Sequence, residues 1–521
     1  MNSKFLKQSF VAASIITIGT NVLGRIFGYA REAVVAGYFG TSAAFDAFLI
    51  AFTIPEIITF IIFAAIPPAL IPFIKKYSYE NEQEESQLFA GSFVSFAIIF
   101  ALLSVLVFVL KKEIIWFLAP TLTGSDYETA LRLMPILAPF IFFRGMEGYF
   151  RAELFNKKHF VIPAISPMII NIFVLAIILL AYDKFNIFAL AYGWLIASFA
   201  LFIINGFVVF SIEKRFSLNK INPGLILKLL KIVGAVAFVE CIALLYPVVD
   251  RFLASRYLGE GQIAALRYAT FLIHLPTGMF VVSFAMASFP WISDFSAPVH
   301  VEKFKKLYNE SLGLIIFLMS FVAAAVILFP SEIVSLALQR GAFDNQSMIL
   351  TSGPLKYFAM GIVFYSVYIF QMRFYYARSE LSKLSLYLMF MLVIKITFSL
   401  LLIERFEQNG LAMATSIAWL VGFVLMSWDL GKRLKINYFK TIIPQAAKIL
   451  IVLIFTIVSW LLLDNYWPVD SNYHFVQTLL RFTVIICSGG ILFLLISLML
   501  KLQEPKIVLS LLRSKLFKNE S

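Results

Sequence analysis

The sequence predicts an all-α membrane protein, with about 14 transmembrane helices in two pseudo-symmetric six-helix lobes plus two C-terminal helices. Of the 521 residues, 61% are hydrophobic and only 14% are charged. Soluble domains have roughly 45–50% apolar and about 25% charged residues. The mean hydropathy of +0.89 agrees with a membrane protein. A water-soluble globular protein, a disordered chain and a collagen-like repeat are therefore excluded.

A helix that crosses the hydrocarbon core needs roughly 20 apolar residues, and about 14 stretches of the chain satisfy this rule. The first seven predicted spans are Phe10–Gly28, Asp46–Pro72, Leu88–Leu110, Leu131–Phe150, Phe160–Tyr182, Ile187–Phe210 and Ile232–Leu253. The second seven are Ile263–Phe289, Leu312–Phe329, Tyr357–Phe374, Leu384–Ile403, Leu411–Trp428, Ile443–Leu463 and Val476–Leu500.

The basic residues predict the orientation of these spans. With a cytoplasmic N-terminus, 27 of the 43 Lys and Arg residues lie in inside regions, and the outside loops hold far fewer. This bias is the one that the positive-inside rule describes. The net charge of +13 therefore suits an anionic leaflet and membrane lipids rather than nucleic acid. The basic and aliphatic tail, 501–521, is expected to lie on the cytoplasmic surface as an amphipathic helix.

Recurring glycine and proline residues indicate an internal duplication. Three positions near the first two spans recur about 220 residues later, in the pairs Gly40 and Gly259, Pro55 and Pro276, and Pro72 and Pro290. Two such repeats predict an N-terminal lobe over 1–215 and a C-terminal lobe over 216–440. The last two spans, 441–500, would be an appendage, and a substrate site is expected between the repeats near the membrane midplane.

Charged residues inside the first spans are candidates for function, because a charge in hydrocarbon costs at least about 2.5–3.5 kcal/mol. Arg25, Arg31 and Glu32 lie in the first segment, and Asp46 opens the second. Gly24 and Gly28 would let another helix approach closely beside Arg25. Arg25 is expected to face a cavity, whereas Arg31 and Glu32 have the alternative of extending to the outer surface.

Later spans carry further isolated charges. Arg144 and Glu147 share one face of the fourth span, so they either bind substrate or neutralise each other. The second half contains Glu240, Asp250, Arg251, Arg267 and Lys395 within apolar helices. Lys395 is far from any predicted helix end, so it is expected to face a cavity or a carboxylate partner.

The sequence contains no catalytic pattern. Its four histidines are scattered, with no pair at the spacing of metal ligands, and neither a phosphate-binding loop nor a nucleophile elbow occurs. Cys241 and Cys487 lie in apolar runs and predict no disulfide framework. We therefore expect no enzyme and no cofactor, but a secondary transporter or flippase with a cationic cavity for an anionic substrate.

Three stretches resemble the MviN/MurJ family, lipid II flippases of the multidrug/oligosaccharidyl-lipid/polysaccharide exporter superfamily. They are GRIFGYAREAVVAGYFGTSAAFDAFLIAFTIP in the first two spans, RAELFNKKHFVIPAISPMIINI at the junction of spans four and five, and VVDRFLAS in span seven. The resemblance covers about the first 300 residues well and the remainder loosely. It implies fourteen helices, a bacterial cytoplasmic (inner) membrane, and transport of the peptidoglycan precursor lipid II to the outer leaflet by alternating access.

The resemblance also implies roles for individual residues. Arg25, Arg31 and Asp46 match cavity positions of the first lobe, where a cationic cavity binds the diphosphate. Asp250 falls where some family members have an ion-binding acid. Coupling to a monovalent ion or to the membrane potential would follow.

The chain departs from the family pattern at expected cavity cations. Thr59 and Phe60 stand where paired arginines are common, and Phe271 stands where span eight usually has an arginine. Arg267 lies one helical turn before Phe271 and is expected to supply the missing charge, or else to extend to the outer surface.

These departures leave a second substrate open. The alternative is a flippase for another polyprenyl-diphosphate-linked oligosaccharide, such as an O-antigen or exopolysaccharide unit. A drug or cation antiporter of the same superfamily would need an acidic rather than a basic cavity, and a membrane-embedded glycan-processing enzyme would need grouped acids or histidines.

Lys395 also suggests how the second lobe works without a metal ion. Its ammonium group is expected to act as a built-in counter-ion for Asp250, because pairing would keep both groups charged in hydrocarbon. The alternatives are contacts of Lys395 with lipid headgroups or with another acid such as Glu240.

We expect Arg25→Ala to abolish transport at normal membrane abundance. A guanidinium binds phosphate through two parallel hydrogen bonds, which an ammonium group does not reproduce, so Arg25→Lys should be only partly active. The measurement is transport normalised to the amount of protein in the membrane. Full activity of the alanine variant would mean that Arg25 is merely structural.

Overall fold

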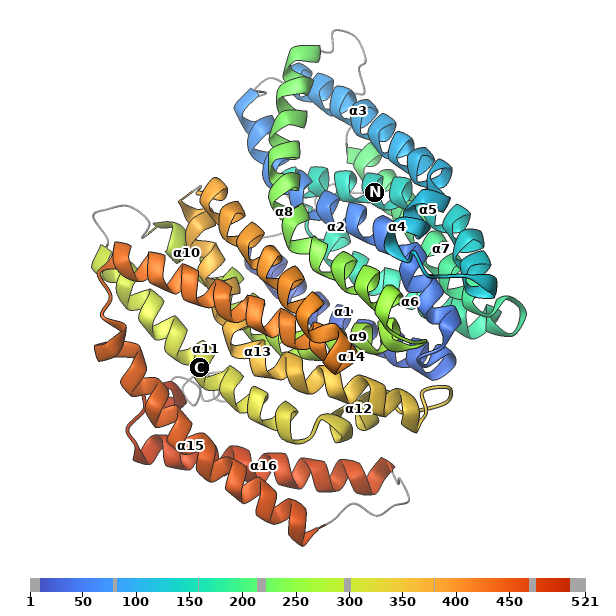
Figure 1. Cartoon of the computed structure of the whole chain (residues 1–521). Coiled ribbons are helices and arrows are strands. Elements are labelled where there is room, and N and C mark those ends of the chain that lie inside the picture. Colours follow the sequence, from blue (N-terminus) through green and yellow to red (C-terminus); the bar gives the residue numbers. More distant parts are fainter. Residues whose placement is uncertain are drawn as a thin grey trace. The chain divides into compact units, whose positions relative to one another are not determined.

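The computed structural model is built of helices and connecting turns, with no β-strand among the residues that it describes (Figure 1). The described residues are 10–77, 82–157, 159–212, 222–294, 301–378, 380–467 and 475–506. The all-α membrane class is confirmed. Most of the amphipathic tail predicted over 501–521 lies outside the described residues.

The helices follow one another with short connections. The first eight are α1 (Phe10–Phe39), α2 (Ala43–Tyr77), α3 (Glu82–Val109), α4 (Lys111–Leu118), α5 (Gly124–Asn156), α6 (Val161–Phe185), α7 (Ile187–Ile212) and α8 (Pro223–Tyr257). After them come α9 (Gln262–Pro276), the π-helical segment η2 (Thr277–Val282), α10 (Ser283–Asp294), α11 (Val301–Leu328), α12 (Pro330–Leu338), α13 (Asn345–Ala377), α14 (Leu381–Leu434), α15 (Tyr438–Tyr466) and α16 (Phe475–Met499).

Eleven of the described helices are long and apolar enough to cross a membrane, or twelve if the bent helix α8 counts as one span. Helix α8 bends by 45° between Ile242 and Leu244. Helix α14 counts once in this total, although it contains two of the predicted spans. The predicted number of fourteen is compatible with these helices, and as an exact number it stays a prediction.

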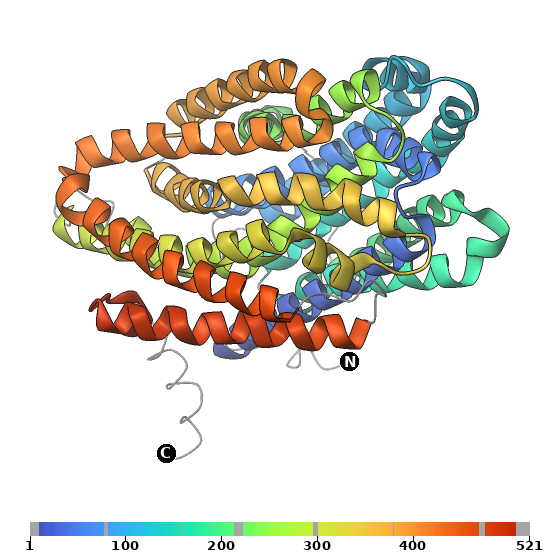
Figure 2. The same ribbon diagram turned by 60° about the horizontal axis from the view of Figure 1, so that its bottom comes forward.

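Helix α14 is a helical hairpin. Glu407 has a non-helical backbone (φ 52°, ψ −134°) and divides the 54 residues into two arms. The arms lie side by side (Figures 1 and 2), and Lys395 Nζ of one arm donates a hydrogen bond of 2.7 Å to the carbonyl oxygen of Leu411 in the other. The two arms correspond to the predicted spans 384–403 and 411–428.

Packing divides the chain into two compact units. The first unit contains the described residues up to Ala264 together with Arg340–Asp344, and the second contains the remainder. Helix α8 thus packs with the first unit, whereas the sequence assigns residues 216–440 to the second lobe. The predicted lobes rest on a duplication in the sequence, whereas the two units rest on packing contacts. The lobes therefore stay a prediction.

Helix α5 is central to the first unit, since it packs against α2, α3 and α7. Its buried Met146, Tyr149 and Phe150 join Ile66 and Leu70 of α2 in one apolar cluster. The Tyr149 hydroxyl bonds to Ser92 of α3, at 2.9 Å. The apolar core therefore fixes α5, which carries several of the charged side chains described below.

Helix α13 has the corresponding place in the second unit, between α11 and α14. Helices α15 and α16 form an antiparallel pair that packs on α11 (Figure 2). Trp460 Nε1 donates a hydrogen bond to the Ile485 carbonyl oxygen at 2.8 Å. A Cβ atom at Gly489 would lie only 1.9 Å from the same indole nitrogen, so a glycine is required at this crossing.

Candidate substrate-binding site

Arg31 is held by neighbours from three helices. Its guanidinium donates hydrogen bonds to Asn171 Oδ1 of α6 at 2.8 Å and to Glu32 Oε2 at 2.9 Å. It also lies 4.8 Å from the ring centroid of Trp194 in α7. The Arg31 and Glu32 side chains are 12% and 4% exposed, so they pack inside the first unit instead of extending to its surface.

Arg25 lies beside the contact between α1 and α6. Cβ atoms at Gly24 and Gly28 would lie 3.5 Å from Pro167 and 3.4 Å from Asn171, so the glycine face of α1 packs closely on α6. Asn171 Nδ2 donates a hydrogen bond to the Gly24 carbonyl oxygen at 3.2 Å. Arg25 itself is partly exposed. This geometry agrees with the close approach that the glycines predict.

Both carboxylate oxygens of Asp46 are occupied by backbone groups. They accept hydrogen bonds of 2.7 Å from the N–H groups of Gly261 and Ala264, where α9 begins. A carboxylate is favourable there because the first N–H groups of a helix lack intrahelical acceptors. Gly261 has φ +79°, and a Cβ atom would lie 2.3 Å from the Thr41 carbonyl oxygen. Asp46 thus joins the start of α2 to the start of α9.

Arg144 and Arg151 project from α5 toward one aromatic ring of α2. Their guanidinium carbons lie 4.3 Å and 5.8 Å from the ring centroid of Phe63. Arg144 pairs with Glu147 at 2.7 Å. The Glu147 side chain is fully buried, and its second oxygen has no hydrogen-bond partner among the described residues. Mutual neutralisation of Arg144 and Glu147 therefore accounts for only part of the charged group formed by Arg144, Glu147 and Arg151.

Arg251 holds α8 against α2. It is buried, and it donates hydrogen bonds to Thr53 Oγ1 and, at 3.3 Å, to Glu56 Oε2. This pairing gives the charge of Arg251 a partner within the protein, which hydrocarbon would not provide. The neighbouring Asp250 is partly buried on the same helix.

The remaining predicted site residues lie in the second unit. Lys395 is completely buried inside the α14 hairpin, where its ammonium group bonds to the Leu411 carbonyl oxygen. Arg267 and Phe271 are both partly exposed on α9. Asp250 belongs to the first unit and Lys395 to the second, so their pairing stays a prediction.

The four predicted substrate-binding residues of the first unit are distributed over three helices. Arg25 and Arg31 lie on α1, Asp46 on α2 and Arg144 on α5. In the part of the chain that the structure describes, no hydrogen bond or ion pair joins one of the four to another. Their common role in substrate binding stays a prediction.

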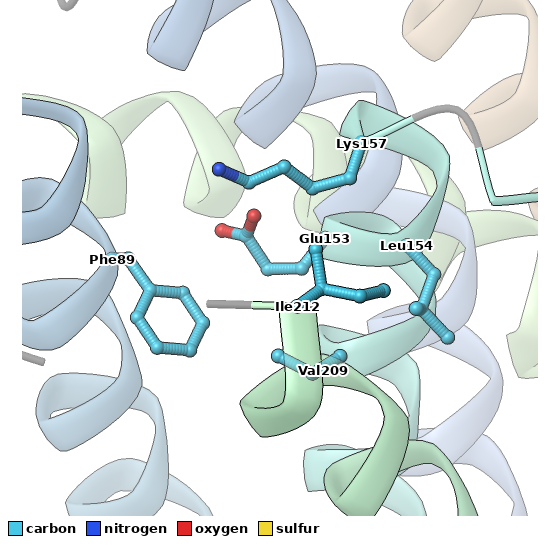
Figure 3. A pocket seen from close by; sticks show the side chains of 6 residues that line it. All are labelled: Phe89, Glu153, Leu154, Lys157, Val209 and Ile212. Atoms are coloured by element: carbon cyan, nitrogen blue, oxygen red, sulfur yellow. The ribbon is translucent and has the colours of Figure 1, made fainter. Parts of the chain in front are cut away.

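A small pocket lies between α3, α5 and α7, and the side chains of Glu153 and Lys157 extend into it (Figure 3). Lys157 Nζ pairs with Glu85 Oε1 at 2.9 Å. The volume of the pocket is about 10 Å³, which is about the space of one water molecule. It is too small for a lipid-linked substrate.

Comparison with protein families decides where the chain belongs. The model of the family described as lipid II flippase MurJ matches residues 35–482. The chain belongs to the MurJ family. A probable lipid II flippase MurJ of Buchnera aphidicola subsp. Schizaphis graminum (strain Sg) is 26% identical over 502 residues, which are 93% of this chain and 96% of the relative. One of Aquifex aeolicus (strain VF5) is 29% identical over 384 residues, covering 71% and 73%.

Solved structures show the same fold over most of the chain. A lipid II flippase MurJ in an inward closed conformation superposes with a TM-score of 0.78, at 22% identity, and covers 93% of this chain and 98% of its own. An inward-facing multidrug resistance MATE family transporter of the MOP superfamily gives a TM-score of 0.69 at 13% identity, covering 81% and 98%.

Two charged residues of this MurJ family member were not among the site residues predicted from the sequence. Arg151 is assigned by sequence to a cytoplasmic region, yet it shares the Phe63 ring with Arg144. The signal is the spacing of Arg144, Glu147 and Arg151, which places all three on one helix face. No local signal pairs Arg251 with Glu56, because 195 residues separate them.

We expect Asp46→Ala to destabilise the protein by about 2–3 kcal/mol, because two buried N–H groups lose a charged acceptor. Asp46→Asn keeps one acceptor oxygen and should have an intermediate effect. Thermal unfolding of the purified protein in detergent measures the loss. Glu302→Ala removes an exposed carboxylate from the first turn of α11 and serves as the control. Equal melting temperatures for the two alanine variants would contradict the role of Asp46 at α9.

Proposed function

We propose that this chain is a lipid II flippase, which moves the lipid-linked peptidoglycan precursor from the cytoplasmic to the outer leaflet by alternating access. The observation that carries this proposal is the match of the MurJ family over residues 35–482. A transporter of this kind breaks no covalent bond of its substrate. The proposal therefore requires neither a catalytic residue nor a cofactor.

The location follows from the same proposal. A multi-pass protein of the bacterial cytoplasmic (inner) membrane would meet its undecaprenyl-diphosphate-linked substrate in the inner leaflet. The distribution of Lys and Arg supports cytoplasmic termini. Membrane lipids are the other expected partners, and nucleic acid is not.

Arginines suit this substrate because a guanidinium donates parallel hydrogen bonds to phosphate oxygens. Arg25 and Arg31 of α1 are proposed to bind the diphosphate, together with Arg144 of α5 and Arg267 of α9. Arg151 is added on structural grounds. Its guanidinium lies beside the Phe63 and Phe155 rings, and the carboxylate near it, Glu147, already pairs with Arg144. The Arg144–Arg151 pair would present two guanidinium groups on one helix face.

One observation favours a second substrate. Thr59 is buried, with its hydroxyl bonded to the Glu56 carbonyl oxygen at 2.9 Å, and Phe60 is 57% exposed. Helix α2 therefore offers no cation at these positions. A different polyprenyl-diphosphate-linked oligosaccharide is the second candidate, because it shares the diphosphate but not the peptide of lipid II.

Complementation decides between the two substrates. We expect the chain to restore growth of a strain depleted of its own lipid II flippase, because it would move the same precursor. Restoration only in a strain that lacks an O-antigen flippase would identify the second substrate instead. Membrane abundance is measured in both strains, so that failure to insert is not mistaken for inactivity.

The same assay tests the arginines. Arg151→Gln should strongly reduce growth, and Lys76→Gln, an exposed cation of α2, should not. Arg267→Ala should also abolish function, and addition of Phe271→Arg should restore part of it by returning the charge one turn away. Normal growth of Arg151→Gln or of Arg267→Ala would remove that residue from the proposed site.

Coupling to an ion is proposed to involve Asp250 and Lys395. A Lys395 ammonium group that acts as counter-ion would make transport insensitive to sodium. We expect Lys395→Ala to lose transport, and Lys395→Ala with Asp250→Asn to regain part of it, because the second change removes the unpaired acid. Transport in vesicles with and without sodium is the measurement. Sodium-dependent transport that survives in Lys395→Ala would contradict the pairing of Lys395 with Asp250.

A further inference from the structure

A groove runs between α3 and α5 on the surface of the first unit. Ala101, Ser104 and Phe108 of α3 line it opposite Ala138 and Phe142 of α5, and its volume is about 430 Å³. Sites for small ligands have volumes of roughly 300–1,000 Å³. Apart from Ser104, these side chains are apolar, so the groove suits a hydrocarbon chain.

The rim of the groove is also apolar. Leu102 and Leu106 of α3 are 62% and 51% exposed beside it. In a membrane-spanning helix, such a surface is covered by lipid or by another protein chain. The groove and its rim therefore form one continuous surface that an aqueous ligand would not select.

Two lysines stand at one end of the groove. Lys111 and Lys112 begin α4 immediately after α3, and Lys111 Nζ lies 5.1 Å from the ring centroid of the groove residue Phe108. Trp116 of α4 is 69% exposed. Exposed tryptophans and lysines are typical of the level of the lipid headgroups. This end of the groove is therefore where a lipid phosphate would lie.

Ser104 supplies an independent observation. Its hydroxyl is buried and has no hydrogen-bond partner among the described residues. A hydroxyl group without a partner is unfavourable in hydrocarbon. Ser104 lies five residues before the end of α3 at Val109, about 8 Å along the helix, and Lys111 begins α4 two residues later. The ester carbonyls of a glycerophospholipid lie between its phosphate and its acyl chains, and they accept hydrogen bonds.

We propose that this groove binds one glycerophospholipid with an anionic headgroup. The acyl chain occupies the space between α3 and α5, an ester carbonyl accepts a hydrogen bond from Ser104, and the phosphate contacts Lys111 and Lys112. Glu113 leaves this end with a net charge of one positive unit, which matches a lipid that carries one negative charge. None of the residues proposed to bind the transported diphosphate lines the groove.

A second copy of the chain is a weaker candidate for the same surface. In a two-fold symmetric contact the same patch faces itself, so Lys111 and Lys112 of both copies would come close together. Like charges at a membrane interface oppose such a contact, whereas they attract an anionic lipid.

The test is a titration of the purified full-length chain with two lipids that have the same acyl chains, phosphatidylglycerol and phosphatidylcholine. Native mass spectrometry gives the affinity for the first bound lipid. We expect phosphatidylglycerol to bind about fivefold more tightly, the factor for one net charge near the headgroups. Lys111→Gln with Lys112→Gln should remove this preference. Lys75→Gln with Lys76→Gln, an exposed pair that also adjoins an aromatic ring, should keep it.

A second pair of variants tests the groove itself. Ala101→Phe fills the space and should weaken binding of both lipids, whereas Leu102→Phe on the exposed rim should not. Equal affinities for the two lipids, a preference that persists without Lys111 and Lys112, or unchanged binding to Ala101→Phe would each overturn the proposal. A dimer that Ala101→Phe disrupts would assign the groove to a second copy of the chain.

Discussion

Hydrocarbon does not solvate charge, so a charged side chain in a membrane-spanning helix needs its partner within the protein. In the first unit this requirement decides which helices meet. Arg31 joins α1 to α6 and α7 through Asn171 and Trp194, and Asp46 joins α2 to the start of α9. Arg251 joins α8 to α2 through Glu56. Each pair places a polar contact at a helix crossing. Such a contact is directional, so it fixes the position of one helix along the other more closely than apolar packing alone.

The second unit satisfies the same requirement at its two ends. At one end, Asp429 accepts hydrogen bonds from Tyr375, Lys383 and Arg433, so α13 and both arms of α14 are tied together. At the other end, Arg481 of α16 bonds to Asp464 of α15 and to the Trp467 carbonyl oxygen. Between these ends Lys395 has a backbone partner within its own hairpin. Polar contacts therefore tie the helices of this unit together at both ends, and Lys395 adds one within the α14 hairpin.

These contacts separate the charges that hold the fold from those that remain for a ligand. Asp46 and Arg251 use their charged groups on other parts of the protein, and Arg31 uses part of its guanidinium. Arg151 differs, because it lies beside two aromatic rings, which bind a cation without occupying its N–H groups, and the nearby Glu147 pairs with Arg144. A transporter of an anion needs both kinds of charge. In the proposed function, the fixed charges stabilise each unit, and cations such as Arg151 would compensate the charge of the substrate.

The sequence by itself determined the membrane class, most of the helices and the break within α14. Those features depend on local hydrophobicity and on residues near one another in the chain, as the predicted spans 384–403 and 411–428 show on either side of Glu407. It also identified Arg25, Arg31, Asp46 and Arg144 as unusual, since a charge among apolar residues is visible locally. Only the tertiary structure decided what those charges contact. Asp46 meets a helix start 215 residues away, and Arg251 meets an acid 195 residues away. Spacing along one helix specifies a face, but which helix packs on that face depends on the whole fold.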